Sequence, residues 1–202
     1  MPKVFSLDGV VPVVDPTAFV HPGAVLIGDV IIGPDCYVGP GASIRADVGQ
    51  IVMARGSNFQ DNCSAHCFAG GRTEIQEYAS IGHGAVLHGC IVGARAIIGM
   101  NAVVMDGAVI GDDCIVAALA FVRANFEAPG RTIVAGLPAK VLRDITEAEI
   151  EWKKSAYTDY LNTIPRCKAT LEEVEALTEI DDLSPRITIA GAKTLSDFRK
   201  KP

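Results

Sequence analysis

Histidine is the residue type in this sequence whose number and spacing point most directly to chemistry. Four histidines occur among 202 residues, and three of them, His66, His83 and His88, lie within one 23-residue stretch. Neutral imidazole nitrogens are common ligands of zinc and other divalent transition metals. A single outward histidine is more often ordinary polar surface, so the interpretation depends on whether the fold brings these residues together.

A six-residue repeat defines the elements that position the histidines. Each repeat has an aliphatic residue, a small or compact residue two places before it, and often a glycine directly after it. The aliphatic position is occupied in turn by Val14, Val20, Leu26, Ile32, Val38, Ile44, Met53, Phe59, Ala65, Ile75, Ile81, Leu87, Val92, Ile98, Val104, Ile110, Val116 and Val122. A helix would repeat its apolar residues every 3.6 positions and a half-exposed strand every two positions. The period of six therefore predicts short strands joined by turns, as in a parallel β-helix.

Three repeats complete one triangular coil, so these eighteen repeats predict about six coils, stacked about 4.8 Å apart. The predicted fold class is an all-β solenoid with a C-terminal α-helix and tail. The small position also holds four of the six cysteines, which predicts buried free thiols: Cys36, Cys63, Cys90 and Cys114. After Val122 the repeat is expected to lapse, and residues 133–143 are expected to close the prism.

The repeat is irregular around the histidines, where loops can carry function. Three residues are inserted before Met53 and four before Ile75, and one is missing before Val92. His66 and His88 each follow the aliphatic position directly and lie three repeats apart once the four-residue insertion is removed. They are therefore expected to stack on one face about 4.8 Å apart, within reach of a shared metal ion.

His83 follows Ile81 by two residues and belongs to the adjoining corner of the prism, so it is poorly placed to join His66 and His88 within one chain. Packing around a threefold axis would bring it beside the other two histidines of a neighbouring subunit. The sequence thus favours a metal site at each interface of a homotrimer. Cys67 follows His66 and is expected to point away from the stacked pair.

Four further polar residues share this region. Arg45 lies in the column of His66 and His88, and Asp47 follows it at the first insertion. Gln60 and Asp61 lie one coil below His83 on the same corner. Arg45 and Asp47 suit a salt-bridged subunit contact, Gln60 could orient substrate or a metal-bound water, and Asp61 could fix a ligand or the interface.

The segments outside the predicted β-helix of residues 8–143 divide into two parts. Residues 144–180 are predicted to be helical: Thr146 and Glu149 form a capping box, and an apolar stripe ends near Pro165. A second short helix is expected across residues 171–177. Residues 181–202 form a polar tail.

Composition excludes several classes of protein. Eighteen Lys and Arg against 24 Asp and Glu give a net charge of −6 with no basic block, which disfavours nucleic-acid binding. No apolar run is long enough to predict a membrane span or a signal peptide, so a cytoplasmic location is expected. Three imidazole ligands can bind zinc, iron or cobalt, and zinc is the expected metal.

The hexads, together with residues 44–47, residues 58–62 with His66, and residues 81–89, resemble the γ-class carbonic anhydrase group of left-handed β-helix proteins. Residues 98–107 and 152–154 resemble more closely the subgroup of the phenylacetate-degradation protein PaaY and the carnitine-operon protein CaiE. The resemblance implies left-handed coils, a homotrimer, and zinc or iron held by two histidines of one subunit and one of the next. It also implies supporting roles for Arg45, Asp47, Gln60 and Asp61.

One departure from the family's carbonic anhydrases affects the predicted reaction. Those enzymes carry glutamates in an acidic loop that moves protons from the metal-bound water, whereas residues 48–50 and 67–71 here contain no carboxylate. Rapid CO2 hydration needs such a proton transfer. The leading hypothesis is therefore a trimeric metal-dependent acyl-CoA thioesterase that supports phenylacetate-type catabolism. A slow carbonic anhydrase, a hexapeptide acyltransferase and a structural trimer held by metal remain alternatives.

Overall fold

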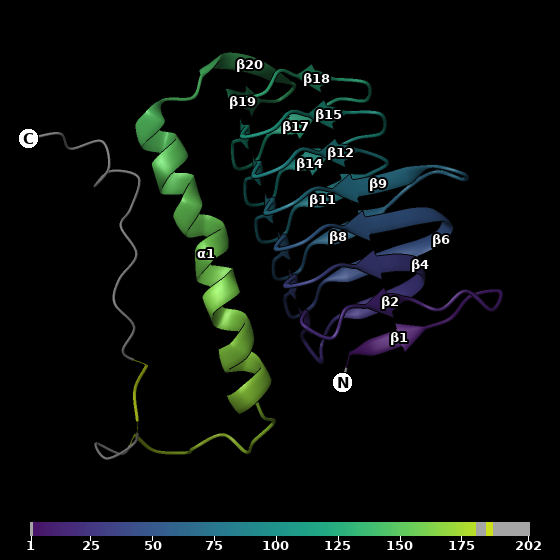
Figure 1. Ribbon diagram of the computed structural model, residues 1–202, viewed down its shortest axis with the longest axis vertical. Helices are drawn as coiled ribbons and strands as arrows, with labels where there is room; N and C mark the ends of the chain where they lie inside the picture. The colour runs from purple at the N-terminus through teal and green to yellow at the C-terminus, as the bar shows by residue number, and fades with distance from the viewer. Residues whose placement is uncertain (1, 181–184, 188–202) are drawn as a thin grey trace, which may run out of the picture.

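The structure, a computed structural model, describes residues 2–180 and 185–187 and is a β-solenoid of about seven turns with one C-terminal helix (Figure 1). Each turn contributes one strand to each of three faces, and neighbouring turns pair in parallel because the chain always winds in the same direction. The predicted solenoid with a C-terminal helix is confirmed.

Each face is a stack of short strands. The first face comprises β3 (Phe19–Val20), β5 (Tyr37–Val38), β7 (Asn58–Phe59), β10 (Ser80–Ile81), β13 (Ile97–Ile98), β16 (Ile115–Val116) and β19 (Thr132–Gly136), closed by the antiparallel β20 (Ala139–Asp144). The second face comprises β1 (Lys3–Phe5), the first parts of β4 (Val25–Ile32) and β6 (Ser43–Met53), then β8 (Ser64–His66), β11 (Val86–His88), β14 (Val103–Val104) and β17 (Phe121–Val122). The third face comprises β2 (Val13–Val14), the second parts of β4 and β6, then β9 (Arg72–Ile75), β12 (Ile91–Val92), β15 (Val109–Ile110) and β18 (Glu127–Ala128).

The interior of the solenoid is a continuous column of aliphatic side chains. The aliphatic position of the repeat is buried in every turn from Val20 to Val122, and the four corner cysteines are buried free thiols, as predicted. Burial raises the pKa of Cys63 to about 11 and that of Cys90 to about 12, because the thiolate is poorly solvated inside. These thiols serve packing rather than catalysis.

The predicted six coils fall short by about one, because β1 adds a strand before the first predicted repeat and the repeat does not lapse after Val122. β18 pairs with β15 and β19 with β16, which places Ala128 and Val134 in the buried aliphatic position. Here the usual sizes are exchanged: Phe126 occupies the small position and packs against the core, while Ala128 is small. The total volume is similar, so the coil still closes.

Helix α1 (Glu147–Thr170) runs along the first face from the last turn to the first (Figure 1). Its 24 residues span about 36 Å, enough to cover the six spacings between seven turns. The predicted capping box of Thr146 and Glu149 is present. Near the other end of the helix, Ile164 packs against Phe19 and Tyr37.

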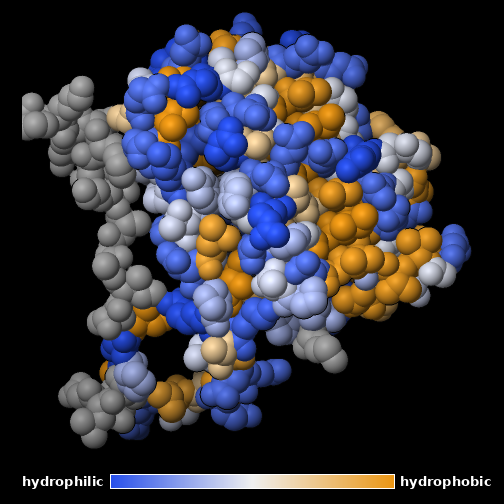
Figure 2. Space-filling model, in the orientation of Figure 1, coloured by the Kyte–Doolittle hydropathy of each residue, from blue (hydrophilic) through white to orange (hydrophobic). Residues whose placement is uncertain are grey.

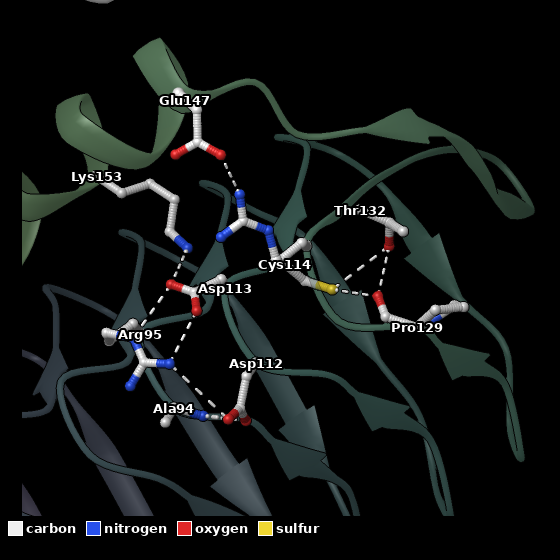
Figure 3. Close-up of polar contacts among 10 residues, drawn as sticks. Ala94, Arg95, Asp112, Asp113, Cys114, Pro129, Thr132, Glu147 and Lys153 are labelled. Carbon is white, nitrogen blue, oxygen red and sulfur yellow. Dashed lines mark hydrogen bonds and ion pairs between the residues drawn. The ribbon is translucent and has the colours of Figure 1, made fainter.

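Charged side chains also hold α1 to the solenoid. Lys153 is only 2% exposed and donates to Asp113 at 3.1 Å, and Arg95 donates to both oxygens of the same carboxylate (Figure 3). Burial opposes ionisation of Asp113, but the hydrogen bonds from Arg95 and Lys153 outweigh it and lower its pKa. Burial likewise lowers the pKa of Lys153, with Asp113 opposing the effect.

The C-terminal segment differs from its prediction in two respects. The helix does not end near Pro165 but continues to Thr170, where Lys168 donates to the carbonyl oxygens of Pro16 and Ala18 in the first turn. Residues 171–177 contain no helix. Their apolar side chains are exposed, and so short a helix is not stable without packing. Of the predicted tail, residues 181–184 and 188–202 lie outside the described residues.

The third face presents an apolar ladder outward. Its strands place Val13, Ile31 and Val52 side by side, and Ile91 and Val109 continue the ladder above Glu74. Figure 2 shows apolar side chains gathered over β2, β4 and β6. Across residues 2–180 and 185–187, no helix combines the length and apolarity needed to cross a membrane.

Candidate metal centre

His66 and His88 lie side by side at the ends of β8 and β11 on the second face. The two residues are register partners, as the repeat predicted, and Nδ1 of His66 lies 3.1 Å from Nε2 of His88. Their ring centroids are 5.1 Å apart, and about a quarter of each side chain is exposed. Arg45 follows Ile44, the partner of Ala65, and so shares their column.

A carboxylate lies against the outer nitrogen of each ring. Nε2 of His66 is 2.7 Å from Asp47, and Nδ1 of His88 is 2.5 Å from Asp106. The hydrogen bond with His66 lowers the pKa of Asp47; burial opposes this effect and Arg45, which forms an ion pair with Asp47, adds to it. Both carboxylates accept, so both outer nitrogens carry the ring protons when the imidazoles are neutral.

The inner nitrogens, Nδ1 of His66 and Nε2 of His88, then face each other as lone pairs. Two lone pairs 3.1 Å apart repel unless a cation or proton lies between them. Two nitrogen ligands on one tetrahedral zinc ion, each about 2.0–2.1 Å from it, are themselves roughly 3.3 Å apart. The donor set and its carboxylate partners therefore fit two of the ligands of a divalent metal.

Thr73 ties the backbones of the two histidine strands together, a role the sequence reasoning missed. Its hydroxyl donates to the carbonyl oxygen of His66 at 2.7 Å and accepts from the amide of Gly89 at 2.9 Å. The side chain is fully buried in the small position of the repeat. This bridge fixes the spacing of the two rings.

His83 lies on the adjoining corner, before β11, whereas His88 lies at the end of that strand. Its Nδ1 is 3.0 Å from Asp61. Gln60 is buried and donates to Asn58, which in turn donates to Ser80. The structure therefore groups Gln60, Asp61 and His83 on one corner, and it does not bring them to His66 and His88 within the chain.

The described residues do not by themselves complete a metal site. Within residues 2–180 and 185–187, no three His, Cys, Asp or Glu side chains are placed to hold one ion. Cys67 is buried, with Sγ near the carbonyl oxygen of Gln50, and burial raises its pKa. The roles of Arg45, Asp47, Gln60 and Asp61 at a subunit contact stay predictions.

Asp106 was also missed, although the repeat contained the signal. It follows His88 by eighteen residues, which is one full coil, and so it lies at the same corner of the next turn. A search for carboxylates one coil above or below each histidine would have found it.

Comparison with known proteins identifies the family. The sequence model of "Bacterial transferase hexapeptide (six repeats)" matches residues 12–46 and 89–124. The carnitine operon protein CaiE of Salmonella agona is 47% identical over 183 residues, which cover 91% of this chain and 92% of that protein. The chain belongs to the CaiE family of hexapeptide-repeat proteins. CaiE of Escherichia coli K12 is 45% identical over the same share of the chain and 93% of its own length.

A solved structure shares the fold of this CaiE-family chain. The hexapeptide transferase family protein from Anaplasma phagocytophilum is 35% identical, with a TM-score of 0.78. The match covers 81% of this chain and 97% of that one.

Replacing Asp106 with asparagine is expected to weaken metal binding about 10–100-fold, because outer carboxylates orient and polarise metal-bound histidines. An asparagine can still accept a hydrogen bond but carries no charge. Zinc affinity measured by competition with a coloured chelator tests this, with Asp112→Asn as the matched control, because Asp112 lies one six-residue repeat further along and contacts Ala94 and Arg95 rather than a histidine. An affinity equal to that of the wild type would show that Asp106 does not support His88.

Proposed function

We propose that this chain forms a homotrimer in which His66 and His88 of one subunit and His83 of the next hold a divalent metal, zinc in the first instance and iron or cobalt as alternatives. The facing lone pairs of His66 and His88 support the site. The lack of a third ligand within the described residues agrees with a shared site. The apolar ladder of the third face provides surface that a subunit contact could bury.

We propose further that the site hydrolyses acyl-CoA thioesters. A divalent ion bound there would lower the pKa of a water ligand toward about 7 and so supply a nucleophile at neutral pH. In the overall reaction the water oxygen bonds to the carbonyl carbon and the C–S bond breaks. The sulfur takes one proton of the water and leaves as the thiol of CoA, and the second proton is released to solvent. The other product is a carboxylate.

Two carboxylates of the chain orient the histidines that would hold the metal. Asp47 and Asp106 accept the outer ring protons of His66 and His88, and this fixes the tautomer in which each neutral imidazole presents its inner nitrogen as the ligand. The loops beside the histidines, residues 48–50 and 67–71, contain no carboxylate that could pass protons to solvent. This supports hydrolysis of thioesters over rapid CO2 hydration. From the resemblance to the PaaY and CaiE subgroup, we place the activity in phenylacetate-type catabolism in the cytoplasm.

Hydrolysis of a small panel of acyl-CoA thioesters, from acetyl-CoA to phenylacetyl-CoA, tests the proposal. We expect turnover by the zinc-loaded protein that is lost on chelation and restored by zinc. CO2 hydration in strong buffer without thioester cleavage would instead indicate a carbonic anhydrase. Acyl transfer to an amine that resists the chelator would indicate an acyltransferase, and dissociation on chelation without any turnover would indicate a structural metal.

A further inference from the structure

Phe68 lies at the candidate site but outside the hydrophobic core. Its ring meets the ring of His88 edge to face, with centroids 4.9 Å apart and planes at 80°. Despite this contact, the residue remains 65% exposed. The ring therefore adds little to the packing of its own chain, and its contact with His88 places it at the candidate site.

The loop that carries Phe68 is held in place on both sides. The amide of Gly70 donates to the carbonyl oxygen of Val48 at 2.7 Å, and the amide of Gly71 donates back to that of Phe68 at 2.8 Å. A Cβ atom on Gly49 would lie 2.3 Å from the carbonyl oxygen of Gly71 and 2.7 Å from Sγ of Cys67, so the two inserted loops pack backbone to backbone. The position of the ring is thus set by the fold.

The two loops themselves carry no charged side chain. These loops are residues 48–50 and 67–71, and Val48, whose carbonyl oxygen accepts from Gly70 of the Phe68 loop, is exposed. A water-facing apolar surface at a polar site suits a ligand with a polar reacting group and an apolar substituent. In a thioester, the acyl group is bonded directly to the reacting carbonyl carbon, so it lies close to the histidines, whereas CoA can extend away.

Resting on the proposed thioesterase function, we infer that Phe68 is the specificity-determining residue for the acyl group and selects aromatic acyl groups over acetyl. A phenyl ring can stack against Phe68 while its carbonyl lies at His66 and His88, because aromatic pairs favour centroid separations of about 4.5–7 Å. An acetyl group is too small to cover the ring.

The test compares wild-type protein with Phe68→Ala and Phe68→Tyr on phenylacetyl-CoA and acetyl-CoA. Phe68→Ala is expected to lower kcat/KM for phenylacetyl-CoA about tenfold, mainly through KM, and to change acetyl-CoA less than about twofold. Phe68→Tyr keeps an aromatic ring and should retain the preference for phenylacetyl-CoA over acetyl-CoA. Leu142→Ala is the matched control, because Leu142 is similarly exposed, at 63%, but lies on β20 at the far end of the solenoid.

Non-hydrolysable thioether analogues of phenylacetyl-CoA and acetyl-CoA separate this inference from the proposed reaction. Their binding affinities are measured by calorimetry, which requires no turnover. If the wild type binds the phenylacetyl analogue and Phe68→Ala selectively loses it, Phe68 recognises the acyl group even if no thioester is cleaved. Equal effects on both acyl groups, or none, would overturn the assignment of Phe68 while leaving any metal-dependent turnover as it stands. Zinc content is measured alongside and is expected to be unchanged in Phe68→Ala.

Discussion

Replacing His88 with alanine is expected to abolish metal binding and, with it, thioester turnover. His88 offers one of the two inner nitrogens 3.1 Å apart, and its loss leaves Nδ1 of His66 as the one inner nitrogen, while Nε2 of His66 keeps its contact with Asp47. Loss of a direct ligand should exceed the roughly 10–100-fold effect of an outer carboxylate. Metal content after dialysis, measured by atomic emission, and turnover at saturating zinc are the two measurements.

The control for this experiment is His21→Ala. His21 lies in the turn after β3 and accepts the amide hydrogen of Gly23 through Nδ1, at 2.9 Å, away from the candidate centre. Its replacement removes an imidazole of the same size and should leave metal content unchanged. Full metal occupancy in His88→Ala, with wild-type affinity, would exclude the proposed centre.

Replacing Phe59 with alanine is expected to lower the free energy of unfolding by about 3–5 kcal/mol, the usual cost of removing a large buried aromatic side chain. Phe59 is fully buried, and the interior of its coil also holds Met53 and Ala65. Ala65 is the smallest of the three, so the interior of this coil depends on the phenyl ring for its volume. Because Ala65 directly precedes His66, the resulting cavity lies in the coil that bears the metal-binding candidate.

Urea unfolding followed by circular dichroism measures this loss, and zinc affinity measured in parallel reports on the centre. Phe59→Leu keeps most of the apolar volume and should cost clearly less. A loss below 1 kcal/mol for Phe59→Ala would mean that the coil collapses around the missing ring, contrary to the close packing expected of this interior.

The sequence predicted most accurately those features that depend only on register. The period of six gives the strands, their stacking and the pairing of His66 with His88, because each is fixed by counting residues. The prediction failed where a large residue stands in the small position of the repeat and a small residue in the aliphatic position. Phe126 and Ala128 are such a pair, so the strands after Val122 were missed.

Contacts that depend on side-chain reach were not predictable in the same way. The bridge by Thr73 requires knowing that its hydroxyl turns toward the backbones of His66 and Gly89, which spacing alone does not state. The end of the helix was also misjudged, because Lys168 reaches carbonyl oxygens 152 and 150 residues earlier in the chain and secures the turn beyond Pro165. Such long-range partners have no local sequence signal.

The reversal of direction at β20 has a consequence for how these molecules behave at high concentration. A stack of parallel strands offers at its last turn a row of unpaired backbone groups, onto which another molecule could add and so begin a fibre. β20 instead pairs antiparallel with β19, and its outer edge carries charged residues at Lys140, Arg143 and Asp144. On the first face the last turn therefore offers no parallel template, and end-to-end polymerisation through that face is blocked.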